Sequence, residues 1–378
     1  MTVEPGWLSG VTSRFAAWVL DTPRWKFLAV LFTVMFFRTG MTFVAPALLP
    51  IAKDPYHNPF TNPYEHYLFW SWLGPFLAHQ VGATTPLTFT LFYLTFSLLF
   101  SLLMVRWLFT RLEEPHARIA MLIFALLPVS ATSYYWIFTD SLTLFLMACA
   151  LYVPRNAPAL FLIGVALGMQ HFEQAFFATG AALFALAWTG RRGVRLAYDW
   201  RWALTLLIGA MAGKALLVAI FAHLDIHVNS GRLFWLIKAW ALMLRRFAYS
   251  YHFALFSAFG VGWLVVIHFL RRPSPETRPV GLAILGLLLL LPISDDPTRV
   301  FAIVTFPLVC VYFLRNPSFL ATIPRQTVGL LALLWCLVPW MFVWSGKPIV
   351  SAAAYDLYTA IHHLLDTRFV PKDPRFPL

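Results

Sequence analysis

Apolar stretches long enough to cross a membrane recur along the whole of this 378-residue chain. A helix needs about 20 apolar residues to cross a hydrocarbon core about 30 Å thick, and short basic loops separate these stretches. Hydrophobic residues make up 60% of the chain and charged residues only 12%, whereas soluble domains carry roughly 25% charged residues. The sequence therefore predicts an all-α protein, a polytopic transmembrane helical bundle that forms a single integral membrane domain over 1–378.

Hydrophobicity and flanking charge together predict about eleven spans. They lie near 26–50, 83–105, 118–133, 136–153, 157–170, 173–189, 202–222, 252–270, 279–294, 299–314 and 327–345. The count depends on 157–189, which is either one overlong helix or two short helices that separate at "QHFEQ". With two helices the arginine-rich loops gather on one side, which the positive-inside rule assigns to the cytoplasm. We therefore expect the break and a cytoplasmic amino terminus.

Four segments lie outside these spans. Residues 1–25 are expected as a cytoplasmic amphipathic N-terminal segment, 51–82 as a long first exoplasmic loop with juxtamembrane helices, 223–251 as an exoplasmic amphipathic segment, and 346–378 as an exoplasmic C-terminal tail. The net charge of +12 is scattered over short loops, so it indicates membrane topology and not nucleic-acid binding. We expect the protein in the inner (plasma) membrane of a bacterium.

The acidic residues favour the opposite, exoplasmic side. They come from distant places, namely the first loop, the start of the fourth span, the break at "HFEQ" and the segment "SDDPTR". Because Asp and Glu contribute little to the orientation of a membrane protein, topology alone does not explain this asymmetry. In one helical bundle these groups can converge on an outward-facing cavity, so the asymmetry indicates a site.

The first loop, "DPYHNPFTNPYEHYLFWSWLGPF", gathers acids, imidazoles and aromatic rings. Asp54 and Glu65 compete as the general base of a reaction at the membrane surface, with His57 and His66 beside them. The alternative is an interfacial loop whose Trp and Tyr rings lie at the headgroup level. The histidines lack the tight spacing of metal ligands, so we predict no metal site, although the carboxylates leave a divalent cation open.

Several cations stand where a lipid phosphate can reach them. Arg38 and Lys214 fall inside predicted spans, where a charge is expensive. Either their long side chains extend to the membrane interface, or they neutralise a phosphate group that enters from the lipid. Arg245 and Arg246 belong to the amphipathic segment, where they either bind lipid phosphate or anchor a surface helix.

Two further groups of acidic residues have either a structural role, as helix caps and turn residues, or a role in substrate binding. Asp140 opens the fourth span, where a carboxylate is favoured as a cap and by the helix dipole. Asp295 and Asp296 precede a proline as turn and cap residues, while Arg299 at a membrane entrance suits an anionic headgroup. Together they indicate a substrate-binding site.

In order, these features resemble the GT-C superfamily of glycosyltransferases that use polyprenyl-phosphate sugars. The resemblance lies in "FFRTGM" followed by the long loop with "NPYEHYLFWSW", in "LLPVSATSYYWIFTDSLTL" with its acid at Asp140, and in "TRVFAIVTFPLVCVYFL" with Arg299. It also includes "GVALGMQHFEQ", in which His171 and Glu173 stand where the family has a basic residue. The resemblance covers roughly residues 26–315.

The resemblance implies a catalytic role for the long first loop, with Glu65 at the place of the family's acid. It implies transfer of a sugar from a polyprenyl-phosphate-linked donor to an exoplasmic glycan, lipid or protein acceptor, by one inverting displacement, in contact with membrane lipids. Two rival functions remain open: a transporter or flippase of a lipid-linked saccharide, and a catalytically silent scaffold of the same fold in a larger assembly.

Overall fold

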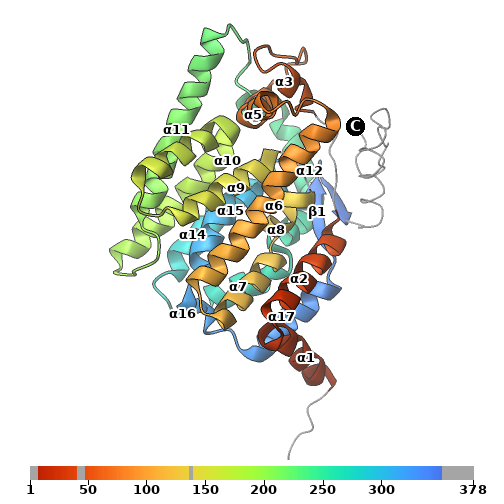
Figure 1. The fold of residues 1–378 in the computed structure, drawn as a ribbon, viewed down its shortest axis with the longest axis vertical. Coiled ribbons are helices and arrows are strands. Elements are labelled where there is room, and N and C mark those ends of the chain that lie inside the picture. The colour runs from red at the N-terminus through yellow and green to blue at the C-terminus, as the bar shows by residue number, and fades with distance from the viewer. Residues whose placement is uncertain (1–6, 41–46, 136–138, 351–378) are drawn as a thin grey trace, which may run out of the picture.

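The computed structural model describes residues 7–40, 47–135 and 139–350, and almost all of its regular structure is helical (Figure 1). The first half contains α1 (Trp7–Asp21), α2 (Arg24–Thr39), α3 (Leu49–Lys53), α4 (His66–Phe69), α5 (Leu73–Gln80), α6 (Pro86–Arg111), α7 (Glu114–Leu126), α8 (Pro128–Tyr135), α9 (Thr139–Tyr152) and α10 (Ala157–Arg191). The second half contains α11 (Trp200–His223), α12 (Arg232–Phe259), α13 (Trp263–Leu270), α14 (Thr277–Leu288), α15 (Pro297–Leu308), α16 (Pro317–Leu320), α17 (Arg325–Leu337), β1 (Met341–Trp344) and β2 (Lys347–Val350).

The helices pack side by side as a bundle, with α3 and α5 at one end and α1, α7 and α16 toward the other (Figure 1). Five helical segments among the described residues are long and apolar enough to cross a membrane: α6, α10, α11, Leu236–Leu270 and Pro297–Leu314. The pair α7 and α8, bent by 60°, makes a sixth if it is counted as one span. A helical bundle compatible with an integral membrane protein is therefore confirmed.

Three further apolar helices are shorter, at Thr139–Tyr152, Thr277–Ile293 and Arg325–Leu337. Some expected spans end early for local reasons. The helix expected over 26–50 stops at Thr39 because Gly40 has φ 74°, a conformation that glycine adopts without a steric penalty. The helix expected over 327–345 stops at Leu337, just before Pro339, which cannot donate a backbone hydrogen bond.

Many helices begin with the same local device, a polar cap residue followed by proline. Thr85, Asp296 and Asn316 each accept a hydrogen bond from a backbone N–H of the first turn. The proline in the next position has its φ angle already set for a helix and lacks the N–H that would need a partner. These caps fix the residue at which each of the three helices begins.

The backbone of α10 breaks at His171 (φ −162°, ψ 79°), within the stretch where the sequence predicts a break. Before the break, Phe161 lies against Gly209 and Val165 against Gly213, so this half runs parallel to α11. Because α11 begins a short connection after α10 ends, the half after the break must return toward the end where α10 begins. The two halves of α10 thus form a helical hairpin.

Small residues let α10 and α11 touch along their backbones. A Cβ atom on Gly168 would lie 2.1 Å from the carbonyl oxygen of Ala210, and one on Gly164 would lie 2.5 Å from that of Leu206. Both helices carry glycines four residues apart, Gly164 and Gly168 in one and Gly209 and Gly213 in the other. This spacing puts small residues on one helix face and allows close packing in an apolar solvent.

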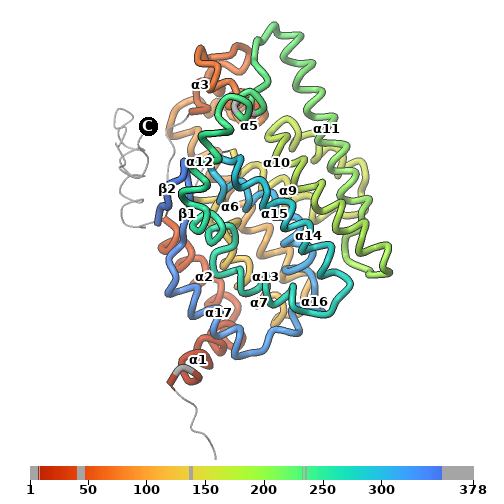
Figure 2. The backbone as a smooth tube through the Cα atoms, turned by 180° about the vertical axis from the view of Figure 1, so that it is seen from behind, coloured from red at the N-terminus to blue at the C-terminus, as the bar shows by residue number. Residues whose placement is uncertain are grey.

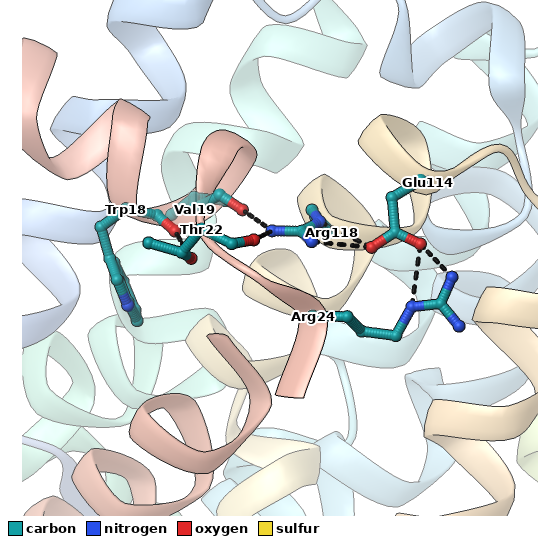
Figure 3. A network of polar contacts seen from close by, with 6 residues as sticks. All are labelled: Trp18, Val19, Thr22, Arg24, Glu114 and Arg118. Atoms are coloured by element: carbon teal, nitrogen blue, oxygen red, sulfur yellow. Dashed lines mark hydrogen bonds and ion pairs between the residues drawn. The ribbon is translucent and has the colours of Figure 1, made fainter. Parts of the chain in front are cut away.

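At the other end of the bundle, Arg118 of α7 fastens the junction between α1 and α2 (Figure 3). Its Nη1 donates to the carbonyl oxygens of Val19 (3.1 Å) and Thr22 (2.6 Å), and its Nε donates to Glu114 (2.8 Å). The side chain is almost completely buried, while Arg24 meets the same carboxylate from the exposed side. Arg118 therefore satisfies carbonyls at the end of α1 that have no partner within the helix.

The chain from α17 ends in a hairpin that lies beside α12 (Figure 2). The strands β1 and β2 pair antiparallel, with Trp344 opposite Lys347. Ser345 and Gly346 form the turn with φ 50° and 74°, as expected of the two-residue turns that match strand twist. The expected tail beyond residue 350 lies outside the described residues.

The contact between α10 and α11 generates a matched pair of predictions. We expect Gly168→Ala to lower the free energy of unfolding by about 1–3 kcal/mol, because the added methyl collides with backbone that cannot move freely. Gly180→Ala lies in the same helix with no atom within 4 Å of the new methyl, so it should be neutral or slightly stabilising. Thermal unfolding in detergent measures both; equal midpoints would contradict the close packing.

A second prediction concerns Arg118. Arg118→Leu should lower the free energy of unfolding by about 2–3 kcal/mol, since it leaves two carbonyls without their donor, one of them buried, and removes a half-buried ion pair. Arg24→Gln, which removes an exposed partner of the same Glu114, should cost less than about 1 kcal/mol. Chemical denaturation in the same detergent measures the free energy of unfolding of both variants. A larger decrease for Arg24→Gln than for Arg118→Leu would contradict the stabilising role of Arg118 at this junction.

Candidate functional site

Arg299, in the first turn of α15, lies between two buried carboxylates. Its Nη1 is 3.2 Å from Oδ2 of Asp140, and its Nε contacts Oδ2 of Asp296. Asp140 comes from the first turn of α9 and is fully buried. We call Asp140, Asp296 and Arg299 the carboxylate–arginine cluster. The sequence predicted all three as site residues, and the fold brings them together.

Local helix chemistry aims these side chains. Asp296 caps α15 by accepting a hydrogen bond from the backbone N–H of Arg299 (3.4 Å). The Arg299 side chain lies back along the first turn, so its guanidinium also contacts the Asp296 carboxylate. Asp140 lies near the positive end of the α9 dipole. With all three groups ionised the cluster carries one excess negative charge.

The titration of Asp296 reflects this crowding. Burial raises the pKa of its carboxyl to about 7, while the Arg299 guanidinium opposes the rise. Each further ionised carboxylate nearby makes the next ionisation harder. Burial therefore favours the protonated form of Asp296, and Arg299 favours the ionised form.

A polar layer joins the cluster to the first loop. The Gln170 side chain accepts a hydrogen bond from the backbone N–H of Gly74 in α5 (2.8 Å) and donates one to the carbonyl oxygen of Thr139 (3.1 Å). A Cβ atom on Gly74 would lie 2.3 Å from the phenol oxygen of Tyr93. Gln170 thus links the loop helix α5 to Thr139 at the start of α9, one residue before Asp140.

The break in α10 contributes to the same layer. His171 lies 3.8 Å from Glu173 (Nδ1 to Oε2), and its Nδ1 accepts a long hydrogen bond (3.4 Å) from the backbone N–H of Gln174. Gln174 is buried, and its amide has no hydrogen-bond partner among the described residues. Sequence reasoning missed Gln170, Gln174 and Tyr93; the signal for the glutamines is their pairing around His171 in "MQHFEQ".

Lys214 lies where the first loop meets α11. Its Nζ is 3.3 Å from the centroid of the Trp70 ring and 5.8 Å from that of Phe172, the residue after the break. A cation over an indole face is favourably placed. Met211 and Val218, nearby on α11, are exposed, so Lys214 lies beside a face suited to lipid.

Asp54 and His57 form a pair on the first loop, with 2.8 Å between Oδ2 and Nδ1. The other oxygen of Asp54 accepts the backbone N–H of Tyr56 (3.0 Å). Burial by itself raises the pKa of Asp54, whereas the hydrogen bonds from His57 and Tyr56 lower it. Together they hold this pKa below its usual value. Both side chains are exposed, and they stabilise a turn.

Glu65 stands at the start of α4 with an exposed side chain. Its carboxylate makes no hydrogen bond or ion pair with another described residue. Two residues later Tyr67 interacts electrostatically with Arg299, which places α4 next to the cluster. His66 holds the loop instead, through contacts to the Phe60 carbonyl (3.1 Å) and the Asn229 N–H (3.2 Å).

The remaining candidate residues lie outside the cluster. Arg246 pairs with Asp295 (2.5 Å), whose carboxylate also accepts the Ser345 hydroxyl (2.8 Å), so these residues clamp the hairpin against α12. Arg38 donates twice to the carbonyl oxygen of Val338 (2.7 and 3.0 Å) and thereby caps the end of α17. Arg245 is exposed on α12.

Within the described part of the chain, no group of three or more His, Cys, Asp or Glu side chains is arranged to hold a metal ion. Comparisons with family models, with curated proteins and with solved structures give no match. The arguments about function therefore rest on the chemistry of the site.

The cluster makes a prediction about pH. Arg299→Gln should be strongly destabilising, because it leaves two carboxylates buried together. The pKa of Asp296, already raised by burial, then rises further, so the stability that this group contributes is present below its unfolded-state pKa and is lost as the pH rises through the raised value. We expect the loss of melting temperature to be larger at pH 8 than at pH 5, whereas the exposed control Arg245→Gln should show no such difference. An equal loss at both pH values would count against an ionised pair.

Proposed function

We propose that the protein is a membrane glycosyltransferase that moves a sugar from a polyprenyl-phosphate donor to an acceptor at the exoplasmic surface. In this proposal the eleven predicted spans cross the bilayer, the amino terminus is cytoplasmic, and α3, α4 and α5 lie on the exoplasmic side. The observation that carries the proposal is the carboxylate–arginine cluster, buried directly beneath the first loop.

Buried charges support a functional site at this place. Ionisable groups within an apolar bundle are expensive, and they mark substrate or ion sites more often than structural ones. A purely structural helix cap needs no second carboxylate and no arginine. The Gln174 side chain adds a buried amide that has no hydrogen-bond partner among the described residues and is therefore available to a substrate.

The residues around the cluster divide the chemistry between them. The acceptor hydroxyl attacks the anomeric carbon, the bond from that carbon to the phosphate oxygen breaks, and the phosphate leaves with the electron pair. Glu65 takes the hydroxyl proton, because its carboxylate is exposed and not engaged in a turn as that of Asp54 is. Lys214, beside the lipid-facing side of α11, neutralises the departing phosphate.

Arg299 has a different role from the phosphate ligand that the sequence suggested. Its guanidinium already faces two carboxylates, so it has little net charge to offer a phosphate. It holds Asp140 and Asp296 in place, and Tyr67 of α4 lies within its electrostatic range. It is therefore a positioning residue, and its loss should impair transfer through displacement of the loop.

The test compares two exposed glutamates. Glu65→Gln should reduce transfer about 100-fold or more with unchanged folding, the size expected for loss of a general base. Glu113→Gln serves as the control, because Glu113 also stands exposed at a helix start without a side-chain cap bond, but at the other end of the bundle. Mass spectrometry of lipids from cells that express each variant should show a polyprenyl-phosphate sugar accumulating only with Glu65→Gln and with the gene deletion.

Three outcomes would redirect the proposal. Full activity of Glu65→Gln with loss of activity in Asp54→Asn would assign the base to Asp54. Translocation of a lipid-linked sugar across vesicles without bond formation would replace the transferase by a flippase. Unchanged lipids and glycans in the deletion strain would contradict both functions and favour a scaffold.

A further inference from the structure

A groove lies between the last turns of α10 and the start of α14, away from the first loop. Its volume is about 470 Å³, and its walls are mostly apolar, formed by Trp188, Gly281, Leu282 and Leu285. Gly281 exposes backbone on this wall, with the Leu270 side chain 3.2 Å from where a Cβ atom would stand, and the two leucines are exposed. An exposed apolar groove on a helical bundle of this composition suits a hydrocarbon chain.

The groove ends at a second, more polar pocket of about 880 Å³. Arg192, Thr277 and Arg278 line both hollows, and Arg272 and Ser274 belong to the second. The groove and the pocket are therefore continuous and form one amphipathic site. Three guanidinium groups surround its polar end.

Two of these three arginines have no acidic partner among the described residues. Neither Arg192 nor Arg278 forms an ion pair or side-chain hydrogen bond with another described residue. Arg192 lies over the Trp188 ring (5.7 Å) and Arg272 donates to the Ser318 carbonyl oxygen (3.3 Å). The polar pocket therefore has an excess of positive charge.

The acid closest in sequence, Glu276, interacts electrostatically with Arg272 and is also bound by a second residue. Its carboxylate accepts a hydrogen bond from the Asn316 amide (2.8 Å), and burial raises its pKa. One carboxylate near three guanidinium groups still leaves the pocket with an excess of positive charge. The first backbone N–H groups of α14 add further positive potential at the same place.

The site lies at the end of the bundle away from α3 and α5, where α14 approaches α16 (Figures 1 and 2). Leu282, Leu285 and Leu289 point outward along α14, so the groove opens on the face that contacts lipid in a membrane. The basic end then falls at the height of the headgroups. Basic pockets between membrane helices bind the phosphates of anionic lipids in this way.

We propose that this groove binds one anionic phospholipid, with its phosphate among Arg192, Arg272 and Arg278 and an acyl chain along Trp188 and Gly281. The arginines supply charge-assisted hydrogen bonds to phosphate oxygens. The apolar wall favours a lipid over a free phosphate, because a soluble anion has no hydrocarbon chain to pack against it. The site does not depend on the proposed transferase activity.

Native mass spectrometry of the full-length protein tests the proposal. The protein is released from nanodiscs that contain equal amounts of phosphatidylglycerol and phosphatidylcholine, and the bound lipid is identified. We expect one retained phosphatidylglycerol in the wild type and at least a tenfold loss of retention in Arg192→Gln/Arg278→Gln. Arg195→Gln/Arg201→Gln is the matched control, since it removes the same charge from exposed positions that line neither hollow.

Two further arms separate the contributions. Leu285→Gln makes an exposed residue of the apolar wall polar without changing charge, and it should reduce phosphatidylglycerol retention. Glycerol phosphate, which has no acyl chains, should fail to compete in the wild type. Equal retention of phosphatidylcholine, equal losses in both double variants, or effective competition by glycerol phosphate would each overturn the proposal. A melting curve of every variant in detergent confirms that it is folded.

Discussion

The structure is organised around one electrostatic requirement, that a guanidinium and two carboxylates buried within an apolar bundle satisfy one another. Arg299 can remain ionised there because Asp140 and Asp296 approach it from two different elements. That pairing sets the positions of the first turns of α9 and α15 relative to each other. The first loop, through Tyr67 and α5, then has a defined polar surface on which to lie.

Close helix packing makes this arrangement possible. The glycines of α10 and α11 bring two backbones into contact, and the break at His171 lets α10 turn back within the bundle. Gln170, just before the break, then reaches both the loop and the start of α9. The packing of α10 against α11 therefore determines whether the first loop meets the cluster. The Gln170 side chain has a fixed length, so small shifts of the α10 backbone would break its two hydrogen bonds.

Part of the candidate site could be predicted from sequence. Asp140, Asp296 and Arg299 stood out because charges at the ends of apolar runs are rare and have few uses. Their partners could not be predicted, since Asp140 and Arg299 are far apart in sequence and the pairing depends on helix packing. For the same reason Arg38 and Arg246 looked like phosphate ligands, although the fold uses them to hold a helix end and a hairpin.

The sequence alone determined that this is a helical bundle with membrane-length apolar segments, because hydrophobicity and the spacing of glycine and proline act locally and without regard to partners. It also located the break in α10 and the cap of α15 at Asp296. Only the tertiary structure decided which charges meet, which loop residue remains exposed, and where a basic pocket joins an apolar groove. Those outcomes depend on distances between distant segments, and the energy of a buried charge changes steeply with such distances.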